Sequence, residues 1–379
     1  MNLLRKSKEQ YKRVLFYTAV IWLLVSTPVF SKEFMMENDW RTAGILLVIN
    51  AVTVGFTFFT FYGIYADSAV SALSTAVYVL SVYRFERYML ERDMAELIFM
   101  AVLPLLFYGI YGIEAGKGIR AVLLLGIGGL VTAVLDIGLL EIAVITVIMT
   151  AVMAFFLNRN GKALLQTGIA VVVDCAAGGI LWLGRMQNTE NYSLIQKNGL
   201  QLSGLLAEFW KIKSKIPGLE EDALYKYPLG IGLFTLAGMG IFLGLWFLGH
   251  ISFQNGGEKS VVGAAAGGGG RVTVCLELCM TLKTFPWDRI QLMNGVTYRV
   301  AGALKTPAAF LTPVIFGCAL IWGYLLDRNK KKKDSFLYLV CVASVVTAII
   351  ASGIYVMDVD NFTVDYYEML QMQSGLETE

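Results

Sequence analysis

Charged residues are scarce in this chain, and histidine and cysteine are scarcer still. Of its 379 residues, 16% are charged and 56% are hydrophobic, which excludes an ordinary soluble enzyme and indicates a polytopic membrane protein. One histidine, His250, and five scattered cysteines provide neither ligands for a structural zinc ion nor a disulfide framework. We expect no metal site and no cofactor, although a divalent metal requirement stays open, and no nucleic-acid partner.

Long apolar runs fill most of the chain. A helix that crosses a bilayer needs roughly 17 to 25 predominantly apolar residues, so the runs predict an all-α integral membrane protein with about eleven spans. The runs near 68 and 260 are the weakest, because the first is short and the second contains Arg271 and Glu277. The spans are expected near residues 13–30, 43–64, 68–83, 97–113, 119–136, 139–157, 163–184, 228–249, 260–282, 307–326 and 335–356.

Basic residues beside the runs predict the orientation. Cytoplasmic loops of membrane proteins carry an excess of lysine and arginine. With eleven spans, the N-terminus is therefore cytoplasmic and the C-terminus lies outside, and the first span is not cleaved as a signal peptide. Residues 1–356 would form one transmembrane domain, and residues 357–379 an acidic tail on the outer face. The basic residues in the loops predicted as cytoplasmic are Lys117, Arg120, Arg159, Lys162, Arg328 and Lys330 to Lys333.

The predicted outer loop 185–227 contains an amphipathic stretch. Leu202, Leu205 and Phe209 alternate with polar residues at helical spacing, which predicts a helix near 199–213 that lies in the membrane interface. Such a helix would either seal the ends of the spans or guide a lipid-borne substrate to an outer-face site.

The densest group of charges lies between two apolar runs, and we call residues 84–96 the charged segment. Charges at the centre of a bilayer are costly, so the segment is expected at a membrane surface or beside a polar cavity. On a helix, its charges would form ordinary surface pairs four residues apart. Alternatively, its arginines would grip phosphate or carboxylate through their planar guanidinium groups. The seven charges are Arg84, Glu86, Arg87, Glu91, Arg92, Asp93 and Glu96.

The residues around the charged segment resemble a known family. Tyr78 to Arg84 fits the pattern Y-x-L-S-x-Y-R, Arg92 to Glu96 fits R-x-x-x-E, and Leu103 to Gly109 fits L-P-L-x-x-x-G. A later F-P-W-D, Phe285 to Asp288, adds to the resemblance. These motifs resemble those of bacterial multi-span proteins labelled as related to 6-pyruvoyl-tetrahydropterin synthase. That group is usually placed with the family C glycosyltransferases (GT-C), which take a sugar from a polyprenyl-phosphate carrier at the outer face of the membrane.

The resemblance implies a GT-C-like fold in the bacterial plasma membrane and a set of site residues. Members of the GT-C family keep an acidic motif in a long first outer loop, where one carboxylate acts as general base on the acceptor hydroxyl. Here the triplet Glu37-Asn38-Asp39 in a short loop fits that role, so Glu37 and Asp39 are the candidate catalytic residues. Leu304 to Leu311 lacks the expected aromatic residue and arginine, so Lys305, Arg299 or Arg289 would have to replace them. The candidate residues for binding substrate and phosphate are Arg84, Arg87, Arg92, Glu96, Arg289 and Lys305.

Acidic residues within the apolar runs support different functions. Asp136, Glu141, Asp174 and Glu277 lie in or beside predicted spans, and ionisable residues inside a membrane are functional candidates by default. Asp174 lies deepest and favours ion coupling.

The leading interpretation is a glycosyltransferase-like protein of cell-envelope glycan assembly, with membrane lipid and a polyprenyl-phosphate-linked sugar as its partners. A multi-span transporter or lipid-carrier flippase, and a non-catalytic membrane scaffold of the same family, stay open as alternatives.

Overall fold

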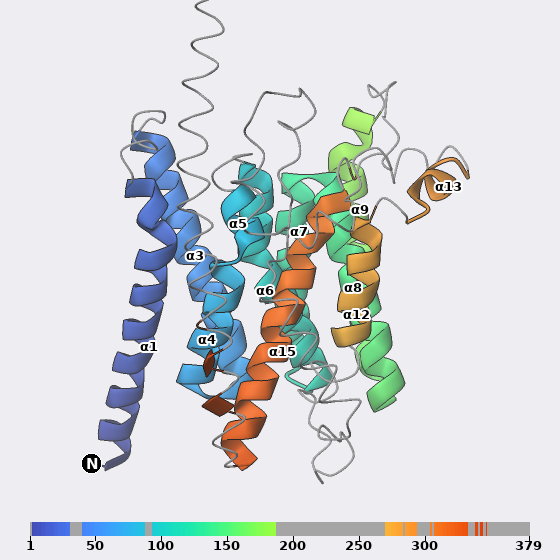
Figure 1. The fold of residues 1–379 in the computed structure, drawn as a ribbon. Coiled ribbons are helices and arrows are strands. Elements are labelled where there is room, and N and C mark those ends of the chain that lie inside the picture. The colour runs from blue at the N-terminus through green and yellow to red at the C-terminus, as the bar shows by residue number, and fades with distance from the viewer. Residues whose placement is uncertain are drawn as a thin grey trace, which may run out of the picture.

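The structure is a computed structural model, and the elements that it describes are all helices (Figure 1). It describes residues 2–30, 40–87, 93–186, 270–282, 285–293, 304, 307–332 and a few positions between 338 and 346. The elements are α1 (Asn2–Ser26), η1 (Thr27–Phe30), α3 (Trp40–Tyr65), α4 (Ser68–Val79), α5 (Val82–Glu86), α6 (Met94–Glu114), α7 (Ile119–Leu135), α8 (Ile137–Asn158), α9 (Gly161–Met186), α12 (Gly270–Thr281), α13 (Trp287–Gln291), η6 (Pro307–Phe310) and α15 (Leu311–Lys332).

Six of the described helices are long and apolar enough to cross a membrane. Several also expose apolar side chains, for example Val172 of α9 and Val48 of α3. Such exposure is expected where lipid rather than water surrounds a helix. The part of the chain that the structure describes is therefore that of an all-α membrane protein. The six spans by length and composition are Gln10–Val29, Trp40–Tyr65, Met94–Glu114, Ile137–Phe156, Gly161–Leu181 and Leu311–Arg328.

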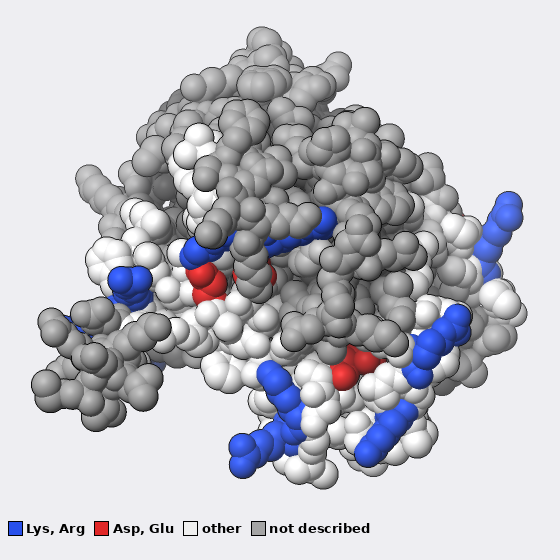
Figure 2. Space-filling model, turned by 90° about the horizontal axis from the view of Figure 1, so that it is seen from below, with Lys and Arg blue, Asp and Glu red and all other residues white. Residues whose placement is uncertain are grey.

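The helices run up and down between two ends of one bundle (Figure 1). The start of α1, the turn before α4 and the C-terminal end of α15 lie at the lower end in that view. Figure 2 shows this end, across which lysine and arginine side chains are spread, and we call it the basic end. The α5 helix and the start of α6 lie at the opposite end. The exposed cations of the basic end, which lie at or beside the lower ends of α6, α7, α8, α9 and α15 in Figure 1, include Lys117, Arg120, Arg159, Lys162 and Lys330.

The predicted span 68–83 is not one helix. The α4 helix ends at Val79 and α5 begins at Val82, with Ser81 in an extended conformation between them. With 12 residues, α4 is about 18 Å long, which is shorter than the hydrocarbon core of a bilayer. The sequence missed this break because the apolar residues continue across it, without a proline or glycine to mark the end of α4.

Several other expectations fall where the structure gives only part of the chain. The α12 helix starts at Gly270, so it covers only the second half of the predicted span 260–282. The predicted spans 228–249 and most of 335–356 lie outside the described residues. The same holds for the amphipathic helix near 199–213 and for the acidic tail 357–379.

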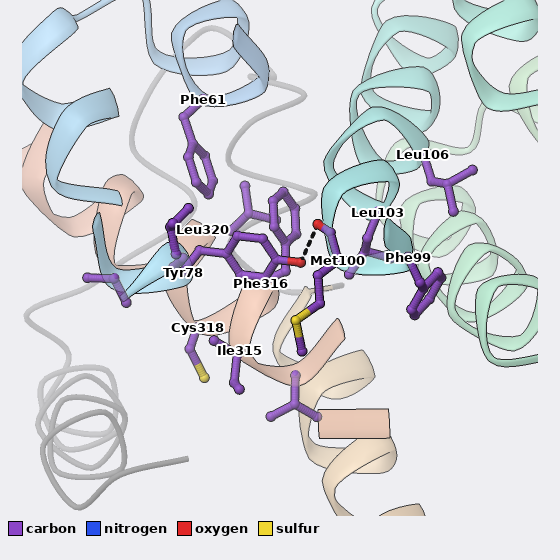
Figure 3. Close-up of a cluster of buried hydrophobic side chains, with 14 of the residues drawn as sticks. Phe61, Tyr78, Phe99, Met100, Leu103, Leu106, Ile315, Phe316, Cys318 and Leu320 are labelled. Atoms are coloured by element: carbon purple, nitrogen blue, oxygen red, sulfur yellow. Dashed lines mark hydrogen bonds between the residues drawn. The ribbon is translucent and has the colours of Figure 1, made fainter. Parts of the chain in front are cut away.

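An aromatic cluster around Phe316 joins α15 to α3, α4 and α6 (Figure 3). The Phe316 ring stacks on Phe61 at 5.2 Å between centroids, meets Tyr78 edge-on at 5.2 Å, and lies 4.6 Å from Phe107. Aromatic pairs at such distances add stabilisation beyond the area that they bury. The cluster therefore fixes α4, and with it the α5 helix that follows, against the centre of the bundle.

A proline inside α6 explains one hydrogen bond in this cluster. Pro104 has no N–H, so the carbonyl of Met100, one turn earlier, loses its partner within the helix. The Tyr78 hydroxyl donates to that carbonyl at 2.8 Å (Figure 3). An unpaired backbone group inside a membrane costs several kcal/mol. The Tyr78 hydroxyl therefore replaces the hydrogen bond that Pro104 removes, and it also connects α4 to α6.

Candidate functional site

Two arginines of the charged segment are buried at the end of the bundle opposite the basic end. Arg84 lies in α5 and Arg87 caps it, and each residue is only 2% exposed. Residues three apart on a helix lie on the same side, so both guanidinium groups enter the bundle from one short helix. The break after α4 places these arginines on a separate helix, because α5 begins at Val82 after the extended residue Ser81.

Arg87 is held by a carboxylate from the next helix. Its Nε lies 3.1 Å from Glu96 Oε2 and donates to the Tyr83 hydroxyl at 3.0 Å. Tyr83 in turn donates to Glu96 Oε1, which also accepts from Thr312 Oγ1 at 3.2 Å. The Arg87 guanidinium also lies 5.1 Å from the centre of the Tyr83 ring. A buried ion pair needs such additional hydrogen bonds to offset the loss of water.

The electrostatics of Arg87 follow from this arrangement. Burial alone would lower the pKa of its guanidinium, but the nearby Tyr83 and Glu96 outweigh that effect and raise the pKa above its usual value. Arg87 is therefore a permanent cation, and Glu96 is the acidic group that lies against it. The pair, its tyrosine and Thr312 connect α5, α6 and α15.

Arg84 reaches in a different direction, toward α3 and α1. Its Nη2 donates to Asn50 Oδ1 at 2.6 Å, and the Asn50 amide donates to Ser26 Oγ at 3.4 Å and to the Val25 carbonyl at 3.5 Å. Asn50 is 1% exposed in the middle of a long apolar helix. A polar residue in such a helix needs a partner inside the protein, and Arg84 supplies it.

The segment is not one helix with pairs four residues apart, as one of the two interpretations required. Asp93 has an extended backbone, with φ −75° and ψ 93°, and its carboxylate accepts from the Glu96 N–H as the N-cap of α6. Glu96 consequently starts a new helix and pairs with Arg87 across the connection. Arg87 and Glu96 therefore form an interhelical contact and not a pair on a solvated helix surface.

The structure brings together only part of the predicted site. Arg84, Arg87 and Glu96 lie in one buried polar group at the end of the bundle opposite the basic end. Arg289 is exposed on α13, which Figure 1 shows well to the side of α5. The remaining predicted site residues, Glu37, Asp39, Arg92 and Lys305, lie outside the described residues.

Four residues of this polar group were not predicted from the sequence. Tyr83 precedes Arg87 by four residues, and this spacing on a short helix could have indicated their contact. Asn50 stands alone as an amide within an apolar run, which is also a readable signal. Ser26 and Thr312 give no local signal, because each meets the group only through the packing of α1 and α15.

A second set of polar contacts lies among α7, α8, α9 and α12. Asp174 is 4% exposed and lies against Gly129 of α7, where even a methyl group would collide with its carboxylate. Glu277 of α12 is fully buried and accepts from Thr146 Oγ1 of α8 at 2.6 Å. No cluster of three or more His, Cys, Asp or Glu side chains suited to a metal ion occurs within the described ranges.

Comparison of the chain with protein-family models, with curated proteins and with solved structures finds no match in any of the three. The candidate site therefore has to be interpreted from its own geometry.

Proposed function

We propose that the protein is a membrane glycosyltransferase-like protein of cell-envelope glycan assembly that uses a polyprenyl-phosphate-linked sugar at the outer face of the bacterial plasma membrane. The observation that carries this proposal is the burial of Arg84 and Arg87 at the end opposite the basic end. By the positive-inside rule the basic end faces the cytoplasm, so these arginines face outward. About eleven spans in a GT-C-like arrangement belong to the same proposal.

The two arginines would have different roles. Arg84 donates to a neutral amide oxygen at 2.6 Å, whereas a phosphate would offer the guanidinium a negatively charged oxygen and two-point hydrogen bonding. A phosphate oxygen would therefore replace Asn50 Oδ1 on the Arg84 guanidinium. Arg87 remains tied to Glu96 and would add a fixed positive charge behind the phosphate. A cation there stabilises the charge that develops on a departing polyprenyl phosphate.

The chemistry would be a direct displacement at the sugar carbon. Glu37 or Asp39 would take the proton of the acceptor hydroxyl as general base while the acceptor oxygen attacks. The bond from the sugar carbon to the phosphate oxygen breaks, polyprenyl phosphate leaves, and the configuration at that carbon inverts. Lys305 and Arg92 would contact the same phosphate, and Arg289 would lie at the rim of the site.

Transfer assays on the purified protein in lipid nanodiscs test this proposal. We expect sugar transfer from a polyprenyl-phosphate donor, and a loss of about tenfold to 100-fold in Arg84→Gln, the equivalent of a hydrogen bond to a charged group. Arg120→Gln, an exposed arginine of the basic end, serves as the matched control and should transfer normally. Equal transfer by Arg84→Gln and the native protein would show that Arg84 does not bind the donor phosphate. Unchanged transfer by a Glu37→Ala/Asp39→Ala variant would show that neither residue is the general base.

Transport is a second candidate, and the buried acids of the spans favour it. Asp174 lies in a helix long and apolar enough to cross a membrane, and Glu277 contacts Thr146 of another such helix. Carboxyl groups at such depth commonly serve ion pathways. A flippase would move a lipid-linked sugar across proteoliposomes without cleaving it. Binding of the lipid-linked sugar with neither cleavage nor movement would indicate the non-catalytic scaffold.

A further inference from the structure

Glu277 is the most deeply buried acid among the described residues, and its surroundings do not balance its charge. The residue has no exposed surface, and its Oε2 atom has no hydrogen-bond partner. Its one described hydrogen bond comes from Thr146 Oγ1 to Oε1. An ionised carboxylate offers about four acceptor positions, so this contact leaves most of them empty.

That one bond fixes the position of Glu277 along α8. The two oxygens are 2.6 Å apart, which lies within the usual range of a hydroxyl hydrogen bond to a carboxyl oxygen. Thr146 lies near the middle of the span Ile137–Phe156, so Glu277 is also held at depth in the bundle. A carboxylate at that depth needs a positive counterpart.

A second oxygen without a partner lies on the same side of α8. Thr150 is one turn after Thr146, so the two hydroxyl groups share a face of the helix. Thr150 is 4% exposed, and its Oγ1 is buried without a hydrogen bond. Figure 1 shows α8 and α12 side by side, which is the contact that brings Glu277 to this face. Thr150 Oγ1 thus lies one helical turn, about 5–6 Å, from the hydroxyl that contacts Glu277.

The helix beside Glu277 packs closely on α15. A methyl group placed on Gly317 of α15 would collide with the Val274 side chain, so this side chain of α12, one turn before Glu277, packs directly on the α15 backbone. Among the described residues, the titratable side chain that faces Glu277 from α15 is the Cys318 thiol, which Figure 3 shows on that helix. From α8 the facing group is the Thr146 hydroxyl. The single negative charge of an ionised Glu277 would be balanced by one monovalent cation.

We propose that Glu277, Thr146 and Thr150 form an intramembrane binding site for a single small monovalent cation, either a proton or Na⁺, with Glu277 as the charged ligand. Both ions satisfy the same requirement, which is one positive charge at the carboxylate. Hard cations and protons are bound by carboxylate and carbonyl oxygens in the same way at the middle of secondary transporters. The inference does not depend on the proposed transferase activity, because it rests on helices on the other side of the bundle from α5.

Thermal unfolding of the purified full-length protein in detergent tests the site. The unfolding temperature is measured over a series of NaCl concentrations, with choline chloride replacing NaCl at constant ionic strength, and over a pH series. A bound ion stabilises the folded state in proportion to the logarithm of its concentration. We therefore expect the unfolding temperature to rise steadily with Na⁺, or with falling pH if the proton is the occupant, and Glu277→Gln to abolish that rise.

Two further variants complete the test. Glu114→Gln removes a carboxyl at the basic end that accepts from Asn158 at 3.3 Å, and it should keep the native response. Thr150→Ala keeps the carboxylate and should raise the half-saturating Na⁺ concentration several-fold, which remains measurable if Glu277→Gln does not fold. A native response in Glu277→Gln, or no response of the native protein to either ion, would overturn the proposal. A response to pH alone would identify the proton as the occupant.

Discussion

Breaking the Arg87–Glu96 pair is predicted to destabilise the fold far more than an arginine substitution usually does. The side chains of both residues are 3% exposed, and their atoms are 3.1 Å apart. The substitution Arg87→Met keeps most of the apolar length of the side chain and removes its charge. Glu96 would then be a buried acid whose described partners are only the hydroxyl groups of Tyr83 and Thr312.

The magnitude follows from the cost of leaving one buried charge without its partner. Removing one member of a buried ion pair costs about 3–5 kcal/mol, whereas replacing both members is often close to neutral. We therefore expect about that loss in Arg87→Met and a smaller loss in the double variant Arg87→Met/Glu96→Gln. The glutamine still accepts from Tyr83 and Thr312. The coupling between the two substitutions should be about 1–3 kcal/mol.

The measurement is reversible unfolding in mixed micelles of dodecyl sulfate and a nonionic detergent, followed by circular dichroism. Arg120→Met is the control, since Arg120 is exposed at the basic end and its replacement should change stability by about 0.5 kcal/mol or less. A loss in Arg87→Met no larger than in the control, or strictly additive losses in the double variant, would refute this view of the pair.

Two other predictions concern packing and the basic end. Gly129→Ala should lower the unfolding free energy by about 1–3 kcal/mol in the same assay, because its methyl group collides with Asp174, whereas Gly126→Ala, with open space around it, should be neutral or slightly stabilising. Partial burial would raise the pKa of Asp67, but the hydrogen bond from Lys330 and those from two N–H groups outweigh it and lower the pKa. The stabilisation by Asp67 is therefore present at neutral pH and lost as the pH falls below about 4, where the carboxyl takes up a proton. The pair is partly exposed, so in a pH series Asp67→Asn should remove about 1 kcal/mol or less of this acid sensitivity, and a steeper acid loss in Asp67→Asn than in the native protein would contradict the assignment.

The helices of the bundle could largely be predicted from the sequence. The predicted span 97–113 corresponds to α6, Met94–Glu114, and 139–157 corresponds to α8, Ile137–Asn158. These predictions hold because a helix in lipid must satisfy its own backbone, so apolar length alone defines it. The break between α4 and α5 could not be predicted this way, because it depends on how α4 packs against Phe316 and Met100.

The contacts of the candidate site were harder to predict from the sequence. The motif around Arg84 and Arg87 was visible, but their partners Asn50 and Thr312 lie far away along the chain and are brought close only by α3 and α15. Glu96 was assigned to the site from its place in the motif, yet its pairing with Arg87 depends on the extended conformation at Asp93. Periodicity and residue type contain no information about such interhelical geometry.

The most direct test of the central claim is an experimental structure of the protein in lipid nanodiscs with a polyprenyl phosphate bound. The account predicts phosphate oxygens within about 3 Å of the Arg84 guanidinium, with the head group on the side of the bundle opposite the basic end. It also predicts that Glu37 or Asp39 lies next to the position of the sugar. A phosphate bound instead among Lys117, Arg159 and Lys330 of the basic end, with Arg84 still joined to Asn50, would contradict the account.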